Sequence, residues 1–100
     1  MSDDKTLMGP IFEESQVLTV ADLSRLCAVE ERRIVEYVEE GVLQIVEVHA
    51  SEWRFRGTAL KRARAAIRLQ RDLELNLPGV ALVMELMDEL EQLRRELARR

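Results

Sequence analysis

The apolar positions of the chain recur with a helical period over residues 18–41 and then with a period of two, and each period predicts an element. Thr19 is a candidate helix N-cap, with Asp22 three residues on as its capping-box partner. Gly41 suits the left-handed conformation in which helices often end. Because the stretch is interrupted at Ala28, the pattern predicts two short helices joined by a tight turn, which is a helix-turn-helix.

A small β-hairpin is expected next. Trp53 and Phe55 alternate with Arg54 and Arg56, as in a strand with two unlike faces, and β-prone residues also occupy positions 43–48. We expect residues 49–52 to connect the two strands. A hairpin placed after a helix-turn-helix forms a wing.

Two further helices are predicted after the wing. The third carries a broad apolar face, opposite a basic stripe. The apolar face comprises Ala59, Leu60, Ala63, Ala66, Ile67, Leu69 and Leu73, and the basic stripe comprises Lys61, Arg64, Arg68 and Arg71. Asn76 and Pro78 then supply an N-cap and a first-turn proline, so a fourth helix is expected from about residue 77 to residue 100.

The fourth helix carries a narrow leucine-rich seam with spacings of three and four residues, as in a coiled coil. The seam consists of Val83, Leu86, Leu90, Leu93 and Leu97. We expect an antiparallel helix from a second copy to bury it, which predicts a homodimer. Packing of the helix on its own chain, or a frayed end, is the alternative.

Length and composition fit one domain, because the chain has 100 residues of which 47% are hydrophobic and 34% charged. We divide it into a loose arm over residues 1–17, which has room for a short edge strand, a winged helix-turn-helix domain over residues 18–75, and a C-terminal helix over residues 76–100 as a dimerisation coiled coil. The expected fold class is mainly α.

Few residues offer catalytic or metal-binding chemistry. Cys27 falls on an apolar helix face and His49 in a polar turn, and together they are far short of a zinc ligand set. A Gly-rich phosphate loop and a Ser/His/Asp arrangement are both absent. We therefore expect no enzyme activity, no metal and no cofactor. The chain lacks an apolar run of about 18 residues and a signal pattern, so we expect no membrane association and a cytoplasmic location.

Charge is strongly partitioned along the chain. Residues 1–52 carry 12 acidic and 4 basic side chains, whereas residues 53–71 carry 7 basic and no acidic ones. A helix-turn-helix often binds DNA through its second helix, and here Arg54, Arg56 and Arg68 are candidate phosphate contacts. The second helix, however, holds five glutamates against two arginines, and carboxylates oppose binding to a polyanion. Direct DNA binding is therefore the disfavoured alternative.

The same acidic helix suits a basic protein partner, because opposite potentials steer association and fix orientation. The candidate contacts are chosen from charge placement alone. They are Asp22, Glu31, Glu36, Glu39 and Glu40. A charged face that is merely solvated is the alternative.

Two stretches of the chain resemble the CbpM family of chaperone modulators, which have a MerR-like helix-turn-helix. They are LTVADLSRLCAVEERRIVEYVEEGVL and WRFRGTALKRARAAIRLQRDLELNLPGVALVMELMDELEQLR. The most specific features are Trp53 and Phe55 in the wing and the block at residues 68–90, which includes Pro78 and Gly79.

The resemblance implies a non-enzymatic inhibitor of the DnaJ-like co-chaperone CbpA. Members of the family bind the J-domain of that co-chaperone, compete with its Hsp70 partner and suppress its DNA binding. The implied partner here is the J-domain of a CbpA-like co-chaperone. J-domains resemble one another in a basic helix, which agrees with an acidic binding surface. A MerR-like transcription regulator that binds DNA is the alternative.

Overall fold

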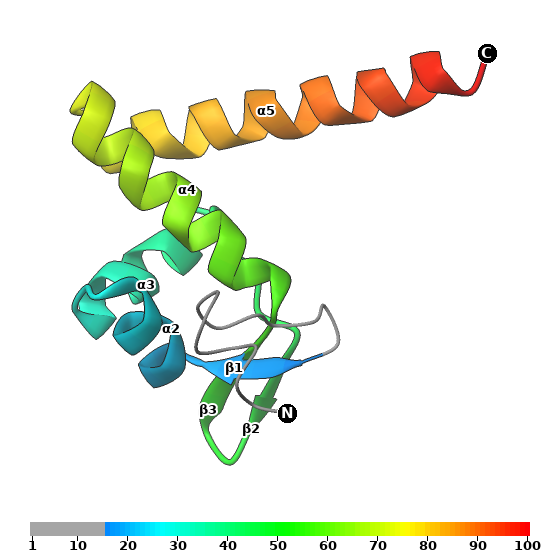
Figure 1. Cartoon of the computed structure of the whole chain (residues 1–100). Coiled ribbons are helices and arrows are strands. Elements are labelled where there is room, and N and C mark those ends of the chain that lie inside the picture. The colour runs from blue at the N-terminus through cyan, green and yellow to red at the C-terminus, as the bar shows by residue number, and fades with distance from the viewer. Residues whose placement is uncertain (1–15) are drawn as a thin grey trace, which may run out of the picture.

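The computed structural model describes residues 16–100, so residues 1–15, most of the predicted arm, lie outside the described residues. The described chain forms a small antiparallel sheet and four helices, ordered as in Figure 1. Their bounds are β1 Val17–Thr19, α2 Val20–Cys27, α3 Glu31–Glu39, β2 Glu47–His49, β3 Glu52–Arg56, α4 Thr58–Leu73 and α5 Leu77–Ala98. This confirms the mainly α fold class, with a hairpin wing and a long C-terminal helix.

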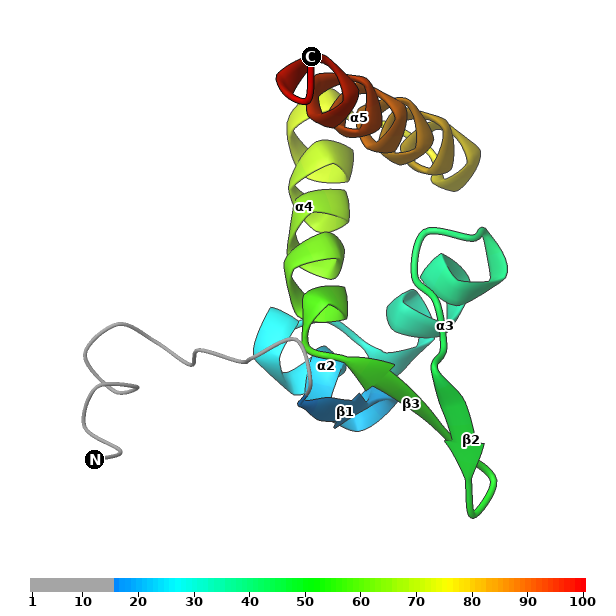
Figure 2. The ribbon, with the colours of Figure 1, turned by 90° about the vertical axis from the view of Figure 1, so that its right-hand side faces the viewer.

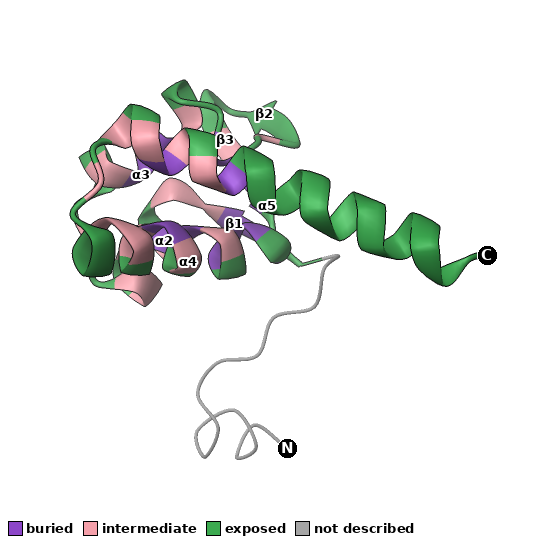
Figure 3. Ribbon diagram, turned by 90° about the horizontal axis from the view of Figure 1, so that it is seen from above, coloured by how far each residue is buried: buried purple, intermediate pink, exposed green. Residues whose placement is uncertain are grey.

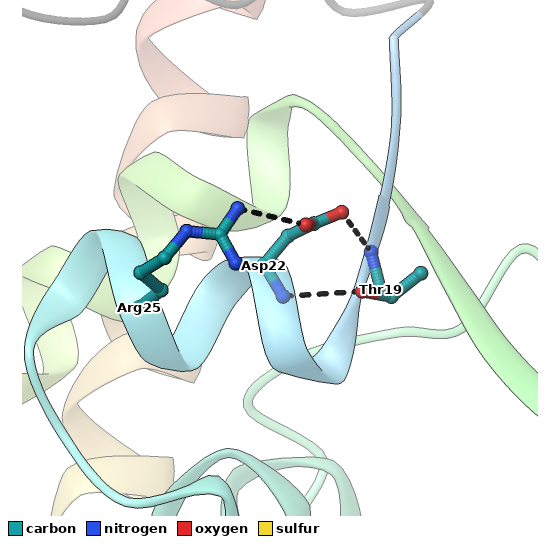
Figure 4. A network of polar contacts seen from close by, with 3 residues as sticks. All are labelled: Thr19, Asp22 and Arg25. Atoms are coloured by element: carbon teal, nitrogen blue, oxygen red, sulfur yellow. Dashed lines mark hydrogen bonds and ion pairs between the residues drawn. The ribbon is translucent and has the colours of Figure 1, made fainter.

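The helix-turn-helix begins at the predicted N-cap. The Thr19 hydroxyl accepts a hydrogen bond from the Asp22 backbone N–H at 3.1 Å, and the Asp22 carboxylate accepts one from the Thr19 N–H at 3.0 Å (Figure 4). The capping box is therefore complete. After α2 the chain turns at Ala28, which has a positive φ of 59°. Alanine thus occupies a conformation that glycine adopts without steric cost.

α3 ends as its sequence predicts. Gly41 has a φ of 81°. Its N–H donates to the Val38 carbonyl at 3.0 Å, while the N–H of Val42 donates to the Tyr37 carbonyl at 2.8 Å. These two bonds form a Schellman motif, which satisfies carbonyls that the helix end leaves free. The motif fixes how the chain leaves α3 towards the wing.

The sheet contains one strand more than the predicted hairpin. β1 pairs antiparallel with β3, and β3 pairs antiparallel with β2, giving the order β1-β3-β2. Leu18 on β1 lies opposite Phe55 on β3, and both side chains are buried. Because three residues alone give a weak alternation signal, the apolar pattern does not single out β1.

The wing's connection is tighter than predicted. His49 and Glu52 pair with each other, so only Ala50 and Ser51 form the loop. Both loop residues have positive φ values, 53° and 64°, as in the two-residue turns that suit twisted hairpins. Such turns are usually signalled by Asn-Gly, and the Ala-Ser pair gives no such signal.

α4 runs from the end of the sheet to α5, as Figure 2 shows. The hydrophobic core lies where α2, α3, the sheet, one side of α4 and the first turns of α5 meet. Its buried members are Leu18, Leu23, Ile34, Tyr37, Val42, Leu43, Phe55, Ala59, Leu60, Ala63, Ala66, Val80 and Met84. Three alanines of α4 are among them, and their small side chains allow the other helices to approach its backbone closely.

One residue expected on the apolar face of α4 is exposed. Leu73 is 59% exposed, because α4 ends at this residue and Glu74 takes the left-handed conformation, with a φ of 53°, that turns the chain towards α5. α5 then begins as predicted. The Asn76 side chain accepts a hydrogen bond from the Gly79 N–H at 2.8 Å, and Pro78 lies in the first turn.

Candidate protein-binding surface

The acidic residues of α3 lie at its two ends. Glu31 is the first residue of the helix, whereas Glu36, Glu39 and Glu40 gather at its C-terminal end. Eight residues separate Glu31 from Glu39, which is about 12 Å along the helix axis. We call Glu36, Glu39 and Glu40 the acidic end of α3. Glu31 belongs to the same helix but not to this cluster.

The acidic end is poorly neutralised within the described part of the chain. Glu36 has one ion pair, a long contact of 3.9 Å with Arg32, whose side chain is 81% exposed. Glu39 and Glu40 are exposed, and no ion pair joins them to another residue among positions 16–100. An exposed pair of this kind contributes little, so the local negative charge is almost fully available to a partner.

The helix dipole makes this placement unfavourable in the free protein. A helix C-terminus carries a partial negative charge, so carboxylates there are repelled while cations are attracted. The last turn of α3 contains no basic residue. A cation from outside would therefore be stabilised both by the glutamates and by the helix end.

Asp22 has a different role from the glutamates. Its carboxylate caps α2 through Thr19 and also pairs with Arg25 at 3.1 Å (Figure 4). The hydrogen bond from the Thr19 backbone N–H is the main cause that lowers the pKa of Asp22 below its usual value, although partial burial opposes the shift. The structure thus gives Asp22 a role in holding the start of α2.

The three arginines of the DNA-binding alternative are not brought together as one group. Arg54 lies on β3, where its guanidinium pairs with Glu52 at 3.7 Å and contacts His49 at 3.4 Å. Arg56 lies two residues on and is exposed. Arg68 is exposed on α4, ten residues or about 15 Å along the helix from its start. Only Arg54 and Arg56 are close neighbours on one element.

α5 has two apolar faces. Val80 and Met84 are buried against the domain. The exposed part of the predicted seam consists of Leu86, Leu90, Leu93 and Leu97, which are 50–66% exposed, while Val83 is partly buried. At 100° per residue the exposed seam lies about 130° around the helix from the buried face. Figure 3 shows the C-terminal half of α5 extending from the domain, exposed along its length.

Arg62 is a structurally important residue that the basic stripe does not include. Its Nε donates to the Val42 carbonyl at 2.9 Å, and its Nη1 lies 2.8 Å from the Asp88 carboxylate. Arg62 therefore ties the end of the α3 segment to α5. The spacing of the basic residues gives no sign of this role, because both partners are distant in sequence.

The described residues contain no group of three or more His, Cys, Asp or Glu side chains that could hold a metal ion. Burial raises the pKa of the Cys27 thiol, which keeps it in the less reactive protonated form. Within residues 16–100, the helices are all too short or too polar to cross a membrane.

The winged helix-turn-helix followed by a long helix defines a class. The family model described as MerR HTH family regulatory protein matches residues 18–99, so the class is that of MerR-type helix-turn-helix proteins.

Curated relatives define the family within that class. The chain is 34% identical over 91 residues to the chaperone modulatory protein CbpM of Coxiella burnetii strain Dugway 5J108-111, which covers 91% of this chain and 86% of the relative. It is 36% identical over 85 residues to CbpM of Pseudomonas putida strain W619, covering 82% and 84% of the two chains. The chain therefore belongs to the CbpM family, and the suspected resemblance is confirmed. These relatives are named as modulators, not as enzymes.

Proposed function

We propose that this protein is a non-enzymatic chaperone modulator that binds the J-domain of a CbpA-like co-chaperone in the cytoplasm. Binding would inhibit both the stimulation of Hsp70 and the DNA binding of that co-chaperone. Membership of the CbpM family supports the general role. The observation that carries the specific proposal is the acidic end of α3, where exposed Glu39 and Glu40 and half-buried Glu36 lie at the negative pole of a helix.

A basic helix of the J-domain is the proposed counterpart of the acidic end of α3. Its cations would meet three carboxylates and the negative pole of the α3 helix dipole together, which favours a defined orientation. Glu31, about 12 Å away, would serve as a peripheral contact. Asp22 would contribute little to binding, because its carboxylate already caps α2.

We further propose that the exposed seam of α5 forms a homodimer. The helix is polarised, since residues 77–91 contain four acidic and no basic side chains, whereas residues 92–100 contain four basic and one acidic. In an antiparallel pair each acidic half meets a basic half, while a parallel pair would place like charges together. Charge therefore favours the antiparallel arrangement.

DNA binding remains the second candidate function, and the MerR-type fold is the observation that favours it. The wing presents Arg56 as an exposed cation, but Arg54 is already engaged by Glu52. Neutralising Arg54, Arg56 and Arg68 together should abolish any salt-sensitive shift of duplex DNA. If the unmodified protein does not shift duplex DNA in a gel at low salt, DNA binding is excluded as its function.

A charge-reversal variant tests the main proposal. Glu36→Lys with Glu40→Lys should abolish inhibition of co-chaperone-stimulated Hsp70 ATPase activity, while circular dichroism still reports a folded helical protein. A matched control is Glu47→Lys with Glu74→Lys, which makes the same charge change at two exposed positions outside α3 and α5 and should inhibit like the unmodified protein. Full inhibition by the α3 variant would refute the assignment of the surface.

A further inference from the structure

A second charged surface, opposite in sign to the acidic end of α3, lies along α4. Two adjoining hollows of about 260 and 380 Å³ share Ile67 and Arg71 and run between α4 and the turn that joins α2 to α3. We call them together the α4 groove. Half-buried apolar side chains, Leu26, Ile67 and Leu75, line it. Its rim holds Arg33, Arg64, Arg68 and Arg71.

The charges on this rim are largely uncompensated within residues 16–100. Arg64 reaches the Leu26 carbonyl, at 3.5 Å, and Arg33 reaches the Gln70 side chain, at 3.4 Å, and both of these partners are neutral. Arg71 pairs only with its sequence neighbour Asp72. Of the four guanidinium groups around this apolar groove, only that of Arg71 forms an ion pair among residues 16–100.

This arrangement lowers the stability of α4 in the free protein. Arg64 and Arg68 are four residues apart on the same helix, and Arg68 and Arg71 are three apart. Like charges at such spacings on one helix face repel each other. A bound anionic ligand would offset this repulsion, because it attracts all three arginines.

We propose that the α4 groove binds an acidic peptide segment that also carries large apolar side chains. Planar guanidinium groups match carboxylates with paired hydrogen bonds, and apolar side chains of the peptide would cover Ile67 in the floor. A nucleic-acid backbone would satisfy the rim but leave the apolar floor unused, so the combination favours a peptide. The α4 groove is independent of J-domain binding at the acidic end of α3, because three of its four arginines lie on α4 and its charge is opposite.

The geometry predicts the spacing of the acidic residues in the ligand. Arg64 and Arg71 lie seven residues apart on α4, which is about 10 Å along the axis. A helical ligand would therefore present carboxylates two turns apart, and an extended ligand would present them about three residues apart. An apolar residue between them would face the floor.

Fluorescence anisotropy with a labelled synthetic peptide of glutamate, leucine and serine tests the proposal. The peptide should bind the full chain saturably. Arg64→Gln with Arg68→Gln should weaken binding by about tenfold, equivalent to ~1.4 kcal/mol, because two of the four rim charges are lost. Both side chains are exposed and glutamine is a good helix former, so this variant should remain folded.

Controls separate a specific groove from general attraction. Arg99→Gln with Arg100→Gln removes the same charge from the end of α5 and should leave peptide binding unchanged. A peptide in which serine replaces leucine should bind more weakly. Equal losses in the two double variants, equal binding of both peptides, or no binding would overturn the proposal. Binding of duplex DNA but not of peptide would also overturn it. So would a change in the molecular mass of the Arg64/Arg68 variant in solution, because the groove would then be a contact with a second copy of this chain.

Discussion

Removing the two terminal glutamates of α3 should make the free protein more stable while making it a weaker binder. Glu39→Gln with Glu40→Gln deletes two carboxylates at the negative pole of the helix, where no basic side chain of the last turn offsets them. Each exposed charge at a helix end is worth ~0.3–1 kcal/mol, so the pair should add roughly 0.6–2 kcal/mol to the free energy of unfolding. Glutamine has nearly the same size and helix propensity as glutamate, so packing should not change.

Thermal and urea unfolding at neutral pH measure this gain. For a domain of this size, Tm should rise by roughly 4–8 °C for each kcal/mol, provided that protein concentration is held constant. The gain should shrink in 1 M salt, where the Debye length falls to about 3 Å. Glu47→Gln is the control. It removes one exposed carboxylate from the wing, away from helix ends and from α5, so Tm should stay nearly unchanged.

Two results would contradict the reasoning. If the Glu39/Glu40 variant is no more stable than the unmodified protein, the helix end does not repel its glutamates as proposed. If it is more stable and still binds the J-domain with undiminished affinity, the acidic end of α3 is not the binding surface. A gain in stability together with a loss of affinity would support both the repulsion at the helix end and the role of the acidic end of α3 in binding.

Three further predictions concern the fold and the dimer. Ala28→Gly should raise the free energy of unfolding by ~0.5–1 kcal/mol in urea titrations. Glycine relieves the left-handed strain at a φ of 59°, and this gain is partly offset because glycine gives the unfolded chain more conformational freedom. A loss of stability would refute the prediction. Asp22→Asn should destabilise the protein at neutral pH. The difference should shrink as pH falls below the ordinary carboxyl pKa of 3.8 and disappear once pH is below the lowered folded pKa, because the carboxyl is then protonated in both states; a gap that persists at such low pH would contradict the capping role. Leu90→Lys should convert a dimer into a monomer by light scattering, because it places a charge in the exposed seam; an unchanged mass would exclude the seam as the dimer contact.

The sequence predicts the helices well because their signals are local. Thr19, Gly41 and Asn76 each cap a helix through bonds to residues a few positions away, so the caps can be identified from spacing alone. β1 and the tight wing turn are harder to predict. The strand has three residues, and the turn uses Ala50 and Ser51 at positive φ instead of the residues that usually mark it.

The site is less predictable than the fold because exposure and pairing depend on distant residues. Composition shows that α3 is acidic, but only the structure shows that Glu39 and Glu40 lack an ion pair among the described residues while Asp22 is occupied in a cap. The same holds for Arg62, whose partners Val42 and Asp88 come from other segments. Long-range contacts of this kind leave no periodic signal in the chain.

Titration of this protein into the isolated J-domain of a CbpA-like co-chaperone from the same source tests the central claim most directly. Calorimetry at low and high salt should show saturable binding that weakens as salt screens the charges at the acidic end of α3. Glu36→Lys with Glu40→Lys should weaken binding by at least about tenfold, or ~1.4 kcal/mol. Absence of binding by the unmodified protein, or binding that neither salt nor this variant weakens, would contradict the account.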